Sequence, residues 1–120
     1  MLVIFTRAIL NSLSELKDWF RLGARMQHGC FLGLGAIIRG SPILEGNDNN
    51  IASGAVLDCI GGSIHLGSGV RVRRGARIYA WGGQIRIGMN VSLNSGVTVY
   101  GTGGIKIGNN VRIAANSVLV

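Results

Sequence analysis

The sequence predicts an all-β fold, a parallel β-solenoid of about four coils that carries an N-terminal α-helical cap. The first observation behind this prediction is an internal repeat, since one residue pattern begins again at Ile64, Ile85 and Ile105, about every 20 residues. The second is the alternation of apolar and polar residues inside each copy. The third is the recurrence of glycine or asparagine at equivalent places between the alternating segments.

Each copy contains three alternating segments that are too short to be helices. In the second copy the apolar residues are Ile85, Ile87, Val91, Leu93, Val97 and Val99, and Arg86, Ser92 and Thr98 stand between them. A period of two places these two sets on opposite faces of a strand. The three segments are therefore predicted to form the three sides of one coil, whose inward side chains stack on those of the next coil.

The turns between the segments are restricted to two residue types in these copies. The equivalent positions are Gly69, Asn90 and Asn110 in the first turn, and Gly75, Gly96 and Asn116 in the second. Glycine and asparagine adopt a positive φ at the least cost. The pattern thus predicts a left-handed backbone conformation at all of these positions.

A weaker copy is expected to begin at Ile43, with Asp48 at the turn position and with Glu45 and Asn49 in place of inward apolar residues. On this alignment, residues 1–40 form the N-terminal helix and capping segment and residues 41–120 form the parallel β-helix, within a single domain. The pattern leaves open whether residues 33–38 belong to a still earlier coil with a shifted register.

A helix is expected over residues 6–27, with Thr6 as its N-cap. Its apolar residues recur at helical spacing at Leu10, Leu13, Leu16 and Phe20, and polar residues that include Asp18 fall on the opposite side. One interpretation is a cap over the first coil, because an open solenoid end exposes apolar side chains and unpaired backbone groups. The other is a helix that contacts a membrane surface through Trp19, Phe20 and its arginines.

The location of the protein is judged from its N-terminus and its cysteines. Residues 1–5 are apolar but too few for a signal peptide or a membrane span. Cys30 and Cys59 lie far apart and lack the spacing of a redox or metal-binding pair. Free thiols fit a reducing compartment, so a cytoplasmic location is expected.

The net charge of +7 is unevenly distributed, because no Asp or Glu follows Asp58. The predicted register stacks the outward residues of successive coils into three ladders. These are His65, Arg86 and Lys106; Arg71, Ser92 and Arg112; and Arg77, Thr98 and Val118. Stacked like charges repel, so the basic face either binds an anionic ligand or is simply solvated. No recognition helix is apparent, so no specific nucleic-acid binding is expected, while a nonspecific contact with polyanions stays open.

Aromatic residues mark one corner of the predicted coils. Tyr79 and Tyr100 occupy equivalent positions, and Trp81 lies nearby. A pair of glycines follows soon after each tyrosine. We expect the two tyrosine rings to stack on each other across adjacent coils.

The chain has two histidines, His28 and His65, which are the first candidates for a general base. Cationic neighbours favour a neutral imidazole at His65, which suits a general base. A lone surface histidine is nevertheless most often only a surface residue. No group of residues has the spacing of zinc ligands, so no metal is expected.

The tandem pattern aliphatic-Gly-x-x-aliphatic-x resembles the hexapeptide repeat of left-handed parallel β-helix proteins, over roughly residues 43–120. The resemblance implies a left-handed solenoid and, since most members are acyltransferases, an acyltransferase activity. Residues 91–99 are similar to the coil of sugar O-acetyltransferases that supplies an active-site asparagine, and Asn94 falls on that position. Residues 107–116 are similar to the segment that leads into the catalytic histidine of those enzymes, which follows shortly after the position of Leu119.

Several expectations follow from this resemblance alone. The co-substrate would be acetyl-CoA or another acyl-CoA, and the acceptor would be a hydroxyl of a sugar or polysaccharide, as in polysaccharide biosynthesis. The protein would be a homotrimer with clefts between its subunits. Two explanations stay open for the histidine that is missing from the matched segment. The chain is either an N-terminal fragment of an O-acetyltransferase or a non-catalytic structural or scaffolding solenoid.

Overall fold

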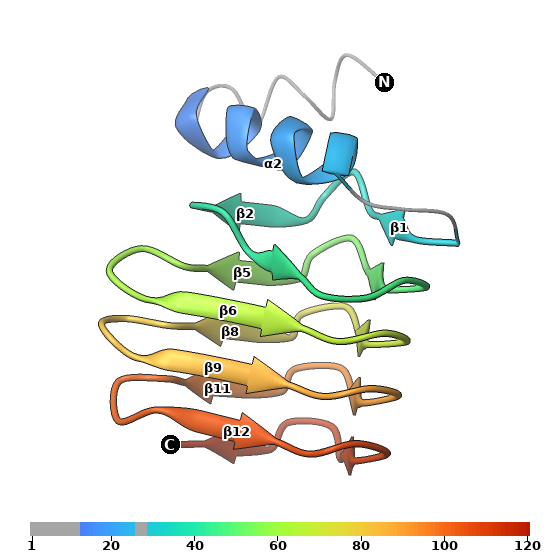
Figure 1. Ribbon diagram of the computed structural model, residues 1–120, viewed down its shortest axis with the longest axis vertical. Helices are drawn as coiled ribbons and strands as arrows, with labels where there is room; N and C mark the ends of the chain where they lie inside the picture. Colours follow the sequence, from blue (N-terminus) through green and yellow to red (C-terminus); the bar gives the residue numbers. More distant parts are fainter. Residues whose placement is uncertain (1–12, 26–28) are drawn as a thin grey trace.

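The computed structural model describes residues 13–25 and 29–120, which form a three-sided parallel β-solenoid with one helix at its N-terminal end (Figure 1). Side A contains β1 (Phe31–Leu32), β4 (Asn50–Ile51), β7 (Arg71–Val72), β10 (Ser92–Leu93) and β13 (Arg112–Ile113). Side B contains β2 (Ile37–Arg39), β5 (Val56–Asp58), β8 (Arg77–Tyr79), β11 (Thr98–Tyr100) and β14 (Val118–Leu119). Side C contains β3 (Ile43–Leu44), β6 (Ser63–Leu66), β9 (Gln84–Ile87) and β12 (Ile105–Ile107). The described residues thus make four coils and two sides of a fifth, and the predicted fold class is confirmed; left-handedness stays a prediction.

The register of the strands confirms all three outward ladders. On side A, Ser92 pairs with both Arg71 and Arg112. On side B, Thr98 pairs with Arg77 and Val118, and on side C, Arg86 pairs with His65 and Lys106. Every one of these pairings is parallel, so each outward side chain lies beside its equivalents one coil away.

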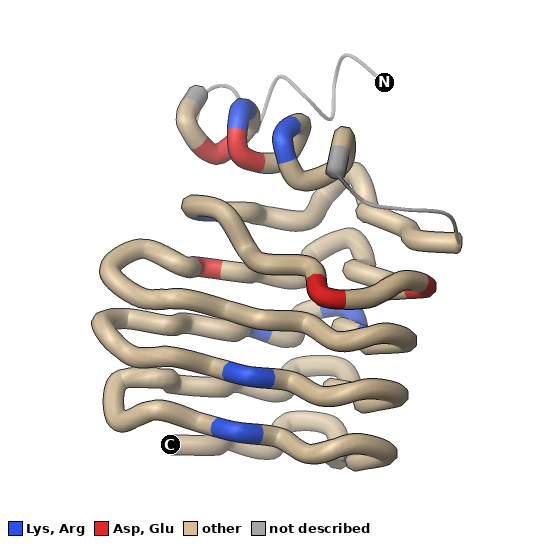
Figure 2. The backbone as a smooth tube through the Cα atoms, in the orientation of Figure 1, with Lys and Arg blue, Asp and Glu red and all other residues tan. Residues whose placement is uncertain are grey.

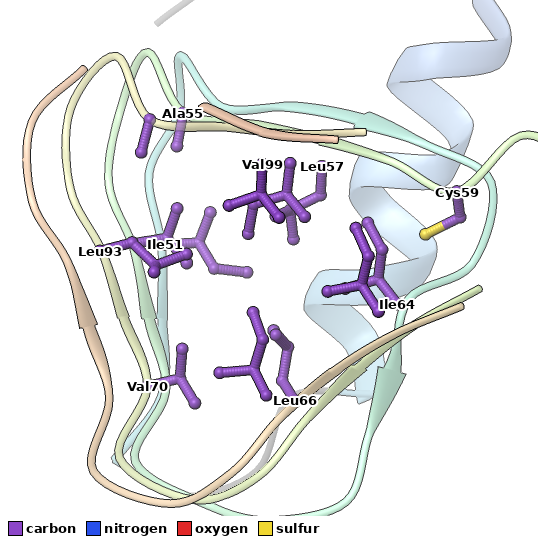
Figure 3. Close-up of a cluster of buried hydrophobic side chains, with 14 of the residues drawn as sticks. Ile51, Ala55, Leu57, Cys59, Ile64, Leu66, Val70, Leu93 and Val99 are labelled. Carbon is purple, nitrogen blue, oxygen red and sulfur yellow. The ribbon is translucent and has the colours of Figure 1, made fainter. Parts of the chain in front are cut away.

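The core is a set of aliphatic columns that run along the solenoid. Figure 3 shows Ile51 and Leu93 directed inward from one side, Leu57 and Val99 from a second, and Ile64 and Leu66 from the third. All six side chains are fully buried. Each such side chain contributes roughly 1.5–3 kcal/mol when it leaves water, and only the neighbouring coils can provide that cover. Stacking of coils is therefore what stabilises this narrow fold.

The turns have the left-handed conformation predicted for them. The φ angles are 69° at Gly69, 56° at Asn90, 61° at Asn110, 74° at Gly75, 75° at Gly96 and 63° at Asn116. Asp48, expected at the same turn position in the weaker copy that begins at Ile43, has a φ of 60°. The restriction to glycine, asparagine and aspartate therefore reflects backbone conformation, since other side chains resist a positive φ.

The inward assignment of Glu45 is wrong. Leu44 pairs with Leu66 and occupies the inward column, while the Glu45 side chain is half exposed on the outer surface. The turn from β3 to β4 has one residue more than the turn from β6 to β7, and this extra residue shifts the alignment before it. Asn49, after the turn, is fully buried as expected, and its Oδ1 accepts a hydrogen bond of 2.9 Å from the Val70 amide.

Parallel pairing already includes residues ahead of position 41. β1 pairs with β4 and β2 pairs with β5, with Ile38 opposite Leu57. These partners are fewer residues apart in the sequence than the partners of the regular coils. A shifted register of this kind is one of the alternatives left open for residues 33–38. Those residues therefore belong to the first coil.

Helix α2 (Leu13–Arg25) covers the open end of the first coil and lies against β2 (Figure 1). Leu22 is fully buried, and the Trp19 Nε1 group donates a hydrogen bond of 3.0 Å to the Gly33 carbonyl. The predicted cap is thereby confirmed for the described part of the helix. Thr6, the expected N-cap, and Gln27, the expected last residue, lie outside the described residues.

The faces of α2 differ from the expectation at two residues. Phe20, expected on the buried face, is 52% exposed, whereas Asp18 faces the solenoid and accepts a hydrogen bond of 2.8 Å from the Gly40 amide. Polar groups are useful on this face because β2 has no strand beyond it, so nearby backbone donors need other partners. Contact of Phe20 with a membrane surface stays a hypothesis. In the described part of the chain, no helix combines the length and the apolar character needed to span a bilayer.

We expect Gly96→Val to lower the free energy of unfolding by more than about 1 kcal/mol, because a β-branched residue resists a positive φ. A Cβ at this position would also lie 2.2 Å from the Asn116 Oδ1 atom. Urea unfolding followed by circular dichroism measures the change. Gly108→Val is the matched control, since a Cβ there meets nothing within 4 Å and its φ is not positive. Equal effects of the two substitutions would contradict the conformational explanation.

Candidate functional site

The basic ladder of side C is the strongest candidate for a functional surface. His65, Arg86 and Lys106 lie side by side on β6, β9 and β12. Figure 2 shows Lys or Arg on β9 and β12, on the face of the solenoid that is turned toward the viewer. Adjacent strands lie about 4.8 Å apart, so neighbouring cations in this ladder repel one another. A bound anion would relieve this repulsion.

Two hollows on this surface share Arg86 and Lys106. One measures about 420 Å³, and its lining includes Glu45, Ser68, Met89 and Asn109. The other measures about 310 Å³ and is completed by Gln84, Gly104 and Ile105. The second hollow has two cationic side chains and no carboxylate in its lining. It is therefore the better place for a phosphate group.

Lys106 and Arg86 differ in their partners. The Arg86 Nη1 atom lies 3.6 Å from a Glu45 carboxylate oxygen. For Lys106, no carboxylate lies within ion-pair distance among residues 13–25 and 29–120. Glu45 would oppose an anion at its own end of the surface. The charge of Lys106 is available to a ligand at the other end.

His65 is in the predicted ladder but is not an open surface residue. Its side chain is only 12% exposed, with Nδ1 3.4 Å from a Glu45 oxygen and Nε2 3.3 Å from the Gln84 amide nitrogen. The contact with Glu45 lacks hydrogen-bond geometry, so it is an electrostatic contact. An amide nitrogen only donates, so Nε2 accepts, and the proton of the neutral ring lies on Nδ1, facing Glu45. The lone pair that a general base would use is therefore already engaged.

Asn94, the other candidate catalytic residue, lies on a different part of the solenoid. It follows β10, at the turn between sides A and B, whereas His65 lies on side C. The Asn94 Nδ2 group donates a hydrogen bond of 2.8 Å to the Ile113 carbonyl. This contact ties the turn to the next coil, and it gives Asn94 a structural role. The structure does not bring the two candidate residues together.

Two contacts of His65 were missed by the sequence-based reasoning. Glu45 was assigned inward because the repeat was aligned without an extra residue in the first turn. Leu44, an aliphatic residue directly before it, was the available signal. Nothing in the sequence distinguishes Gln84 from an ordinary outward residue.

Comparison with known proteins gives no assignment. No protein-family model, curated protein or solved structure matches this chain. Among the described residues, no three His, Cys, Asp or Glu side chains come together in a way that could hold a metal ion. The function must therefore be argued from the surface of the solenoid itself.

We expect Lys106→Ala to weaken the binding of inorganic pyrophosphate by about tenfold, because a charge-assisted hydrogen bond to a phosphate is lost. Isothermal titration calorimetry at low ionic strength measures this, and added salt should weaken binding to the unmodified chain. Arg112→Ala is the control, since Arg112 is an exposed arginine of side A. An equal loss in both variants would show that only the overall charge matters.

Proposed function

We propose that this chain is the solenoid of a coenzyme-A-dependent O-acetyltransferase, or an N-terminal part of one, that acts on a hydroxyl of a sugar or polysaccharide. The observation that carries the proposal is the hollow of about 310 Å³ that is lined by Arg86 and Lys106 without a carboxylate. The resemblance of the repeat to the hexapeptide acyltransferases gives that hollow a ligand class. Cys30 and Cys59 are not joined in a disulfide, which agrees with a reaction in the cytoplasm.

The hollow suits the phosphate end of coenzyme A. Arg86 and Lys106 would hold the phosphates, and the neutral Gln84 and Gly104 beside them add no repulsion. The thioester of the co-substrate would supply the activated acyl group. The described residues of side C would bind and orient that molecule. Among residues 13–25 and 29–120, His65 has its Nε2 lone pair engaged by Gln84 and does not supply a proton acceptor for the sugar hydroxyl.

A non-catalytic scaffolding solenoid is the second candidate. The hydrogen bond that Gln84 donates to His65 Nε2 favours it, because a general base needs a free lone pair near the reacting hydroxyl. The two candidates differ in whether the side C surface recognises coenzyme A. A scaffold requires no such recognition.

We expect the 120-residue chain to bind coenzyme A at least about tenfold more tightly than adenosine, because only the former carries phosphates for Arg86 and Lys106. The double substitution Arg86→Ala and Lys106→Ala should abolish the difference, whereas Arg71→Ala with Arg112→Ala on side A should not. Equal binding of the two ligands would favour the scaffold.

We also expect no acetyl transfer to a sugar by this chain alone. Turnover that disappears in His65→Ala would refute that expectation.

A homotrimer is also proposed, with side B as the face that approaches a neighbour near Thr98 and Val118. Thr98 is 7% exposed and Val118 is largely exposed, so this end of side B offers little charge. Thr98→Arg should convert trimer to monomer in light scattering, because it adds a charge beside Arg77 and at the contact. Ser92→Arg is the matched control, since Ser92 is 8% exposed between two arginines on side A. A monomeric unmodified chain, or equal effects of the two variants, would rule out this face.

A further inference from the structure

Three aromatic side chains gather where side B turns toward side C, at the β8–β9 and β11–β12 connections on the left in Figure 1. Trp81 stacks on Tyr79 with ring centroids 4.5 Å apart and an interplanar angle of 25°. Tyr79 also stacks on Tyr100 of the next coil at 5.7 Å and 24°, which confirms the predicted stacking across coils. Trp81 and Tyr100 are 5.4 Å apart. We call these three residues the aromatic corner.

The aromatic corner is open to solvent. Trp81 is 48% exposed although one face of its indole packs on Tyr79. A Cβ placed at Gly82 or Gly103 would meet nothing within 4 Å, so there is free space at both connections. The exposed residues of these connections also include Thr102 and Gly104. Little side-chain cover lies over their peptide groups. The Gly104 amide donates to the Gly101 carbonyl at 2.8 Å, and the other peptide groups of Thr102 and Gly104 can hydrogen bond to a ligand.

Trp81 adopts a backbone conformation that the repeat does not require. Its φ is 38°, whereas the other non-glycine residues with a positive φ, among those described, are Asp48 and three asparagines. A bulky residue in this region is strained, and strain of this kind concentrates at ligand sites. Because the indole is half exposed, burial in the core does not account for the strain. The conformation instead presents the ring at the surface.

From these observations we infer that the aromatic corner is a carbohydrate-binding site that takes a pyranose unit of a glycan. A pyranose has a face of C–H groups, which suits the π-face of an exposed indole, and a rim of hydroxyls. The hydroxyls need uncharged donors and acceptors, which the tyrosine hydroxyls and the exposed peptide groups of the glycine connections supply. The inference concerns binding only and does not rest on the acyl-transfer proposal.

Other ligands fit the corner less well. A cation held by aromatic rings is favoured by a free carboxylate, but Asp58 is largely buried, accepts from Trp81 Nε1 at 3.4 Å and lies 3.3 Å from Arg39 Nη1. Single-stranded nucleic acid needs several free cations beside the rings. Arg39 is occupied by Asp58 and Glu15, which leaves exposed Arg77 on β8 as a single cation beside Tyr79. A protein partner needs a wider apolar surface than three rings among glycines.

The test is isothermal titration calorimetry of the full 120-residue chain with soluble hexasaccharides of glucose, of N-acetylglucosamine and of glucuronic acid. We expect at least one of them to bind, and both Trp81→Gly and Gly103→Leu to weaken its binding by about tenfold or more. Trp81→Gly removes the ring and suits a positive φ. Gly103→Leu fills the free space and leaves all three rings in place.

Matched controls separate loss of the site from loss of the fold. Phe31→Ala removes an exposed aromatic residue of side A, and Gly108→Leu adds the same bulk at another glycine with free space around it. Neither should change glycan binding. Failure of the unmodified chain to bind any of the three hexasaccharides would overturn the proposal, as would unchanged binding in Gly103→Leu. Salt-sensitive binding of oligothymidylate that is tighter than any glycan and is lost in Trp81→Gly would also overturn it. If Trp81→Gly does not fold, Gly103→Leu alone decides.

Discussion

Parallel backbone pairing between successive coils is the interaction on which the rest of the structure depends. It places every residue beside its equivalent one coil away, so aliphatic residues form continuous columns inside. The pairing requires turns of one shape, and the backbones approach closely there, as in the 3.2 Å hydrogen bond from the Gly75 amide to the Gly54 carbonyl. The positive φ positions keep this shape in each coil. Core and turns are therefore two consequences of one constraint.

The same constraint makes the first coil different, because no coil lies beyond it. Helix α2 supplies the missing cover, and Arg39 connects it to the solenoid through Glu15 at 2.5 Å and Asp58 at 3.3 Å. Since Arg39 and Asp58 pair between β2 and β5, this network joins the helix to the first two coils. The hydrogen bond to Glu15 is the largest influence on Arg39 and raises the pKa of its guanidinium, with burial acting in the opposite direction and Asp58 in the same one.

Periodicity could predict every feature that repeats and none that depends on a single coil. The ladders through Ser92, Thr98 and Arg86 and the left-handed turns followed from the repeat itself. The placement of Glu45 failed because one extra residue in a turn is invisible when only one copy contains it. Asp18 and Phe20 of α2 were misassigned because helical spacing gives the faces of a helix but not which polar groups of β2 need partners. The contact of His65 with Glu45 depends on that extra residue, whereas its contact with Gln84 joins two regular strands through side chains that spacing alone does not pair.

The inward positions are fixed by packing, so specific chemistry in this fold must lie on outward residues and corners. Outward residues differ widely in exposure, from Arg112, which is exposed, to Ser92 and Thr98, which their neighbours cover. Two places carry features of chemical interest. His65 is held at 12% exposure beside Glu45, and Trp81 adopts a φ of 38° where the neighbouring coils have no such conformation at the equivalent Ile60 and Thr102. Backbone pairing needs neither feature, and the Trp81 conformation costs energy. The glycan proposed at the Trp81 corner would offset that cost, and Arg86 and Lys106 on side C would supply the charge for the anionic ligand proposed there.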